Sequence, residues 1–168
     1  MKRNLPLTLI VLVLVFSCID DNDQLDDCLK SLLTWERLKA EHGNSYKYQT
    51  KFQSWTGYGH TTDLTITNGA VTRRAYEAYL ISDTGSKEIM DSYLEDASQL
   101  GSHEEGSPVA TLEDLYRTCG QDLKVSERTN SRIFTTDELG IVRSCGYVPD
   151  NCADDCFHGF SISSFEWL

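Results

Sequence analysis

The spacing of hydrophobic and polar residues predicts a helix and then a strand in the first part of the chain. Leucines recur at near-helical intervals over residues 26–41, and the turn-forming residues 42–44 follow them. Residues 46–54 then alternate strictly, and the larger, less polar set comprises Tyr46, Tyr48, Thr50 and Phe52. We therefore expect an amphipathic helix that leads directly into a half-buried strand.

A β-hairpin is predicted after the loop at residues 55–60. The dipeptide Asn68-Gly69 favours a two-residue turn between strands at residues 61–67 and 70–79. Such a turn fixes the register of the two strands. The expected cross-strand pairs are Ile66 with Val71 on the buried face, and Asp63 with Arg74, whose charges are complementary, on the other face.

The second half of the chain is predicted to contain another helix and three more strands. Residues 82–108 are polar and weakly periodic, and we expect a long surface excursion there with a short helix at about 87–97. Thr111 is a candidate N-cap for the second helix, whose inner side would comprise Leu112, Leu115, Tyr116 and Cys119. The remaining strands are expected at residues 130–135, 141–147 and 159–167.

These elements predict an α+β fold. We expect an antiparallel sheet of about six strands, packed on one face by two helices, in the order αβββ-loop-αβββ. The chain has 168 residues and 40% hydrophobic residues, which suffices for one buried core. We assign residues 28–168 to a single domain.

The first residues have the tripartite pattern of a secretory signal. Two cations, Lys2 and Arg3, precede an apolar run at residues 5–16, which as a helix would rise only about 18 Å and falls short of the bilayer's hydrocarbon core. The run ends in Leu14-Val15-Phe16-Ser17-Cys18, which resembles the lipobox of bacterial lipoprotein precursors, although Phe16 is larger than the usual residue. The resemblance implies a signal peptide at residues 1–17, cleavage before Cys18, and acyl chains such as palmitate on that cysteine.

An acidic segment follows the lipobox. Residues 18–27 contain five aspartates, which repel one another and favour an extended tether. An acidic stretch after the lipidated cysteine is similar to the export signal of some surface lipoproteins. Residue 19 is Ile, whereas retention in the inner membrane typically uses Asp there. The resemblance implies the outer membrane of the cell envelope, with exposure at the surface as a further expectation.

Two looser resemblances concern the domain itself. The repeated order of elements is similar to tandem-repeat inhibitors of the beta-lactamase-inhibitor kind, which implies a proteinaceous inhibitor. A Tyr-x-Tyr strand after a Trp-bearing helix, with a hairpin at residues 137–140, is similar to a family of small uncharacterised lipoprotein-borne domains. That family implies no role for any residue.

Five cysteines remain once Cys18 carries lipid, so one of them is left over. Export permits disulfides, and we expect two bonds among Cys119, Cys145, Cys152 and Cys156. Three pairings are open, and we favour Cys119 with Cys145 and Cys152 with Cys156. Cys28 would then stay free or pair between molecules. A zinc site at Cys145, Cys152, Cys156 and His158 is the less favoured alternative.

Two clusters of polar residues are candidate sites for chemistry. Asp150, Asp154 and Asp155 lie in one loop and could bind calcium, although a solvated acidic turn is the simpler interpretation because the spacing is not that of an EF-hand. His103 with Glu104 or Glu105 could serve a hydrolase as acid and base, against the simpler interpretation of an exposed loop. A binding patch is also a candidate, at Trp55, Tyr58, His103 and Glu104.

Charge and missing motifs narrow the function. The net charge of −11 becomes −13 without Lys2 and Arg3, which excludes nucleic acid as an expected partner. No nucleophile elbow, phosphate-binding loop or dinucleotide fingerprint is present. We therefore expect no enzyme and no required cofactor, but a lipid-anchored module that binds an envelope protein or a saccharide.

Overall fold

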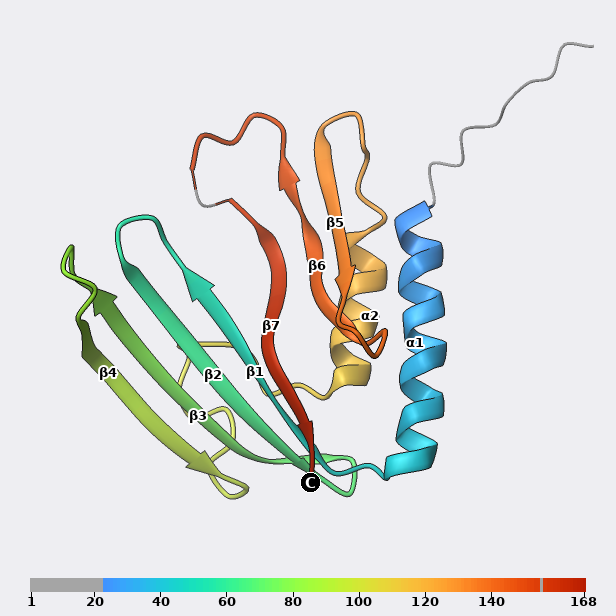
Figure 1. Cartoon of the computed structure of the whole chain (residues 1–168), viewed down its shortest axis with the longest axis horizontal. Coiled ribbons are helices and arrows are strands. Elements are labelled where there is room, and N and C mark those ends of the chain that lie inside the picture. Colours follow the sequence, from blue (N-terminus) through green and yellow to red (C-terminus); the bar gives the residue numbers. More distant parts are fainter. Residues whose placement is uncertain (1–22, 155) are drawn as a thin grey trace, which may run out of the picture.

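The computed structural model describes residues 23–154 and 156–168, which form an α+β fold in the order αββββαβββ (Figure 1). The predicted signal peptide, Cys18 and the first part of the tether lie outside the described residues. Neither helix in the described part has a segment long and apolar enough to cross a bilayer. The helices are α1 (Asp23–His42) and α2 (Leu112–Asp122), and the strands are β1 (Tyr46–Gln53), β2 (Tyr58–Thr67), β3 (Ala70–Ile81), β4 (Lys87–Asp96), β5 (Asn130–Thr136), β6 (Val142–Pro149) and β7 (His158–Trp167).

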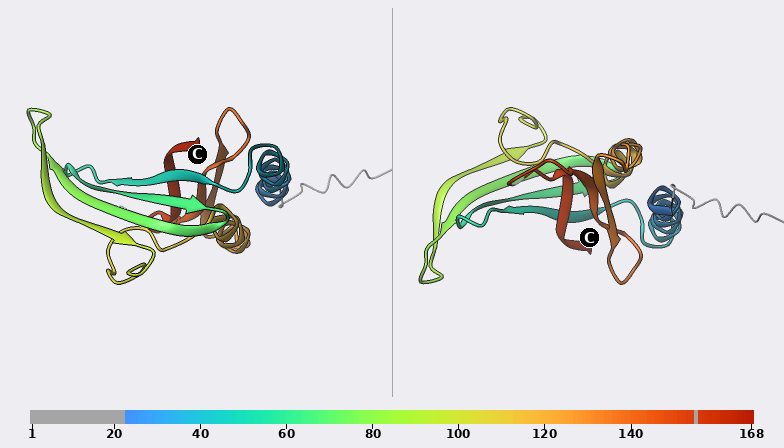
Figure 2. Two further views of the ribbon diagram at one scale, coloured as in Figure 1. Left: turned by 90° about the horizontal axis from the view of Figure 1, so that it is seen from below. Right: turned by 90° about the horizontal axis from the view of Figure 1, so that it is seen from above.

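All seven strands belong to one antiparallel sheet with the spatial order β4-β3-β2-β1-β7-β6-β5. β7 joins the two halves of the chain, because its first residues pair with β6 and its later residues pair with β1. α1 packs against β5 and β6, and α2 packs against β6 and β7. Figure 2 shows that α2 and the segment between β4 and α2 lie on the same side of β1–β4. We call this side the inner face.

The fold class was predicted correctly, but the sheet has seven strands rather than about six. The additional strand is β4, which occupies the segment where a short helix was expected at residues 87–97. Most of its side chains are exposed. Because neither face is largely buried, the sequence lacks the alternation of apolar and polar residues that marks a half-buried strand. Pairing with β3 along Arg73–Ile81 decides the structure of this edge strand, and tertiary pairing of this kind overrides local preference.

The first helix begins earlier than expected and takes in part of the predicted tether. α1 starts at Asp23, so residues 23–27 form its opening turns rather than an extended segment. Carboxylates near a helix N-terminus are stabilised by the unpaired N–H groups and by the helix dipole. The aspartates that were expected to extend the chain therefore favour helix at this point.

The second helix begins where its sequence predicted. The Thr111 hydroxyl accepts a hydrogen bond from the Asp114 N–H, and the Asp114 side chain accepts one from the Thr111 N–H. This reciprocal pair is a capping box. The predicted inner side is also correct, because the buried residues are Leu112, Leu115, Tyr116 and Cys119.

The hairpin forms at Asn68-Gly69, where both residues have positive φ angles, of 51° and 82°. Ile66 faces Val71 as predicted. The second predicted pair is wrong, because a bulge at Thr65/Ile66 shifts the register and Arg74 lies opposite Leu64 instead of Asp63. The bulge thus turns Arg74 onto the inner face, where its side chain is buried.

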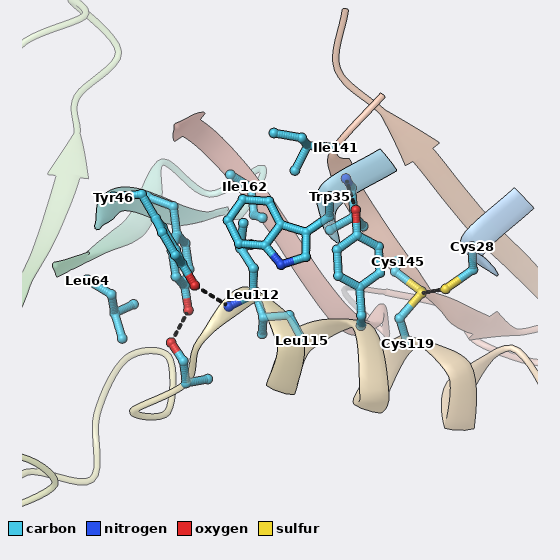
Figure 3. Close-up of a cluster of buried hydrophobic side chains, with 14 of the residues drawn as sticks. Cys28, Trp35, Tyr46, Leu64, Leu112, Leu115, Cys119, Ile141, Cys145 and Ile162 are labelled. Carbon is cyan, nitrogen blue, oxygen red and sulfur yellow. Dashed lines mark hydrogen bonds between the residues drawn. A yellow bond between two sulfur atoms is a disulfide. The ribbon is translucent and has the colours of Figure 1, made fainter. Parts of the chain in front are cut away.

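The core is centred on Trp35 of α1, which is fully buried (Figure 3). Its ring stacks on Trp167 of β7 with 5.3 Å between centroids, and meets the edge of Tyr46 at 4.9 Å. Two hydroxyls then tie β1 to the start of α2. Tyr48 donates to the Ala110 carbonyl at 2.7 Å, and Tyr46 accepts from the Leu112 N–H at 3.0 Å. These bonds fix α2 over the inner face.

Two cysteine pairs are at disulfide distance, and they are the two that the sequence favoured. Cys119 of α2 pairs with Cys145 of β6, with 5.5 Å between their Cα atoms, and Cys152 pairs with Cys156 within one loop. Cys28 is a free thiol with 3% exposure, and its Sγ lies 3.3 Å from that of Cys119 (Figure 3). Pairing of Cys28 between molecules would require α1 to leave the core.

Candidate functional site

The sheet opens into a fork where β7 changes partners. The ladder between β1 and β7 ends at the pair Thr50–Ile162, yet β1 continues to Gln53 along β2. Residues 158–161 of β7 pair with β6 instead. In Figure 1, β7 lies beside β1 near the C-terminus and beside β6 at its other end. Residues 51–53 of β1 and 158–161 of β7 therefore diverge.

A groove of about 430 Å³ lies at this fork, roofed by the segment before α2 and by α2 itself. This volume is in the range of small-molecule and side-chain pockets. Three phenylalanines supply much of its apolar lining, and Pro108, Ala110 and Leu115 add to it. The phenylalanines are Phe52 of β1, Phe157 of the loop before β7, and Phe160 of β7.

His60 is the polar side chain whose state matters most in the groove. It faces Phe52 across the β1–β2 ladder, and the two rings stack with 5.3 Å between centroids. Burial lowers the pKa of His60, so the imidazole is neutral at pH 7. Its Nδ1 is buried and has no hydrogen-bond partner among the described residues. Leaving a buried polar atom unpaired costs free energy.

A carboxylate at the C-terminal end of α2 also lines the groove. Burial raises the pKa of Asp122, and the neighbouring His158 partly opposes that shift. The last turn of α2 contains no basic residue, although a helix C-terminus carries partial negative charge. This end of the groove therefore favours hydrogen-bond donors and cations over anions.

Residues 97–111, which join β4 to α2, form one wall of the groove and are called the wall segment. This segment is held by a buried ion pair between Arg74 of β3 and Glu95 of β4. Arg74 Nη1 lies 3.2 Å from Glu95 Oε2, and the two side chains are 2% and 1% exposed. The guanidinium also donates to three carbonyls of the segment, those of His103, Glu105 and Ser107. Because these three acceptors are backbone carbonyls, Arg74 fixes the course of the chain at the wall.

The carboxylate of Glu95 completes this network. It accepts hydrogen bonds from the N–H groups of Gly101 and His103, each at 2.8 Å, and from the His103 imidazole at 3.0 Å. Burial would raise the pKa of Glu95, but these donors and Arg74 outweigh it and lower the pKa to about 2. Glu95 is therefore ionised throughout the physiological range.

The structure does not assemble the predicted hydrolytic pair. His103 is paired with Glu95 and stacks on Tyr93 with 4.0 Å between centroids, whereas Glu104 and Glu105 are exposed. Ser102 Oγ lies 3.2 Å from the same Nδ1 of His103 that binds Glu95. A nucleophile and an orienting carboxylate must use different ring nitrogens, so these three residues do not form a hydrolytic triad.

The predicted binding patch is divided between two places. Trp55 is 78% exposed in the β1–β2 loop, and its indole N–H donates to Asp154 at 3.1 Å. Tyr58 begins β2 and lies near His60, with 6.5 Å between ring centroids. His103 and Glu104 belong instead to the wall segment held by Arg74. The Trp55–Asp154 bond joins the two loops at the open end of the fork.

The acidic loop shows no assembled cation site among the residues that are described. Asp154 is engaged by Trp55, Asp150 accepts a long hydrogen bond from Ser131 at 3.4 Å, and Asp155 lies outside the described residues. No group of three or more His, Cys, Asp or Glu in the described part is arranged as metal ligands. Calcium binding remains a prediction, whereas the zinc alternative loses Cys145 to its pair with Cys119.

The residues that form the groove were not found from the sequence. His60 fell within the loop expected at residues 55–60, whereas the structure places it in β2, and Asp122 and Phe160 carried no motif. Their proximity depends on a ladder between β1 and β7, which are more than 100 positions apart in the chain. The alternation that placed Phe52 with Tyr46 and Tyr48 was the one available signal.

No family model, curated protein or solved structure matches this chain.

Proposed function

We propose that this protein is a non-catalytic binding module of the cell envelope, held at a membrane by lipid on Cys18, and that its ligand occupies the groove at the fork. The groove supports the binding role because it is preformed, largely apolar and equipped with few polar groups. Sites for small ligands and for single side chains of a partner share these properties.

The preformed, largely apolar groove at the fork is the observation that carries the proposal. Three phenylalanines line the groove, and the His60 ring stacks on one of them, Phe52. The neutral imidazole also fits a site that recognises an uncharged donor or acceptor.

The groove is tested with N-phenyl-1-naphthylamine, a neutral dye whose fluorescence rises in apolar sites. We expect saturable binding to the purified protein that Phe52→Ala and Phe157→Ala weaken by about fivefold or more, since each removes stacking area. Ile89→Ala is the matched control, because Ile89 is 48% exposed, against 38% and 37% for the two phenylalanines, and does not line the groove. Equal binding by all three variants would place the dye elsewhere.

The anchor is tested separately by metabolic labelling with a radioactive fatty acid. We expect label on the wild-type chain, and none on Cys18→Ala, which should also accumulate with its leader attached. A Cys28→Ala variant controls for the loss of a cysteine as such. Label that persists in Cys18→Ala would overturn the lipid anchor while leaving the groove untouched.

A further inference from the structure

The two strands that border the groove each have an unpaired edge. Residues 51–53 of β1 pair with β2 on one side, but on the other side the ladder to β7 has already ended. Residues 158–161 of β7 pair with β6 and face the same gap. None of these edge amides or carbonyls has a backbone partner across the fork in the described part of the chain.

Unpaired strand edges are templates for another strand. Natural proteins protect such edges with proline, a bulge, a charged side chain or a cover of helix or loop. Residues 51–53 are Lys, Phe and Gln, all exposed, and Lys51 is the one protective charge among them. An extended segment in the fork would continue the ladder of β1 where β7 leaves it. Such strand addition is a common mode of peptide recognition, in which main-chain bonds supply affinity.

The groove lies beneath this edge on the inner face. Phe52 points to that face, as its stacking on His60 shows. In a strand, alternate side chains point to opposite faces, so every second side chain of an added segment would enter the groove. There it would meet the phenylalanine rings and the His60 ring that stacks on Phe52. Main-chain pairing and a side-chain pocket thus coincide at one place.

Charge restricts the segment further. The chain carries a net charge of −11, and Asp122 and the end of α2 make the groove unfavourable for a carboxylate. Lys51, on the edge itself, is a cation and acts against this preference, but it is a single charge. The favoured segment is therefore neutral or basic.

We infer that the fork binds an extended peptide segment, neutral or basic and bearing a large apolar side chain, which adds to the free edge of β1 and places that side chain in the groove. This inference rests on the proposed binding function and specifies its ligand class. The partner would be a protein with an exposed or flexible strand, rather than a saccharide.

The test begins with a phage-displayed library of random heptapeptides selected on the purified wild-type protein, with Ile89→Ala as a second target. We expect enriched peptides to bind both proteins, to displace the naphthylamine dye, and to lose binding to Phe52→Ala/Phe157→Ala. They should contain a large apolar residue and few acidic ones. Bound peptide should also slow hydrogen exchange at alternate amides of residues 51–53.

The decisive comparison uses three peptides, one enriched sequence and two analogues of it. Both analogues have N-methyl groups on alternate backbone amides, one at the odd-numbered residues and the other at the even-numbered residues. One alternation should weaken binding by at least about tenfold, because it removes the bonds to β1, and the other should have a smaller effect. Equal affinity of all three peptides, or no enrichment at all while the dye still binds, would overturn strand addition and leave the binding function standing. Failure of both dye and peptides would overturn both.

Discussion

Arg74 and Glu95 form an ion pair that is almost completely excluded from solvent, on adjacent strands at the edge of the sheet. The pair does not lie in the groove, but it binds the backbone of the segment that forms the groove wall. A buried pair of this kind contributes modestly to net stability, whereas loss of one partner is costly because the other charge remains buried. The main effect of the pair is to hold the wall segment in position.

We predict that Glu95→Gln or Arg74→Met destabilises the protein by about 3–5 kcal/mol, because each leaves one buried charge unpaired. Urea unfolding measures the change. The exposed pair Lys47–Glu166 is the control, and Glu166→Gln should cost less than about 1 kcal/mol. Similar losses from Glu95→Gln and Glu166→Gln would contradict the burial that the structure assigns to the first pair.

Stability should fall in acid through Glu95. The folded-state pKa of Glu95 is about 2, against an ordinary value of 4.5, because hydrogen bonds and Arg74 outweigh burial. Its contribution is therefore complete above about pH 4.5 and is lost as the pH falls toward 2. Unfolding free energies measured at several pH values should decline more steeply for wild type than for Glu95→Gln. Parallel declines would show that other carboxylates account for the acid sensitivity.

Gly106 is expected to be the most sensitive glycine of the wall segment. Its φ angle is +81°, and an added Cβ would lie 2.6 Å from both Thr62 Oγ1 and Tyr76 Cδ2. Gly85 has the same φ angle, with nothing within 4 Å of an added Cβ. We expect Gly85→Ala to cost about 1–2 kcal/mol from backbone strain, and Gly106→Ala to cost about 1–3 kcal/mol more from overlap. Thermal melts of the two variants provide the comparison, and dye binding should weaken in Gly106→Ala alone.

Cys28 should be unreactive in the folded protein. Burial raises the pKa of its thiol to about 11, and the thiolate is the reactive form. Iodoacetamide at pH 8 should modify Cys28 at least about 100-fold more slowly in the native protein than in urea, as followed by mass spectrometry. Leu33→Cys, at a position of α1 that is 72% exposed, provides a thiol that should react in both states. Fast native labelling of Cys28 would show that α1 opens readily.

The elements that were predicted correctly are those whose signals are local. The alternation of Tyr46, Tyr48 and Thr50 reports one buried face, and the Asn68-Gly69 turn and the Thr111 cap depend on backbone geometry within a few residues. Where a bulge intervened, the same logic placed Arg74 on the wrong face. Local patterns determine elements, but one inserted residue redirects every side chain beyond it.

The site was not predictable in the same way. Glu95 lies on an edge strand whose exposed residues resemble a loop, and its role depends on Arg74 and on the turn that follows it. The groove depends on where β7 leaves β1, which no local pattern encodes. Long-range pairing therefore determined both the additional strand and the candidate function.

The place of β7 in the sheet affects when this protein can fold. Although β7 is the final strand of the described chain, it fills the middle of the sheet, and Trp167 completes the stack on Trp35. A nascent chain that lacks these residues has two open edges, at β1 and at β6, and an incomplete core. The two halves of the sheet can therefore join only after β7 has been synthesised, because β7 alone among the described strands pairs with both β1 and β6.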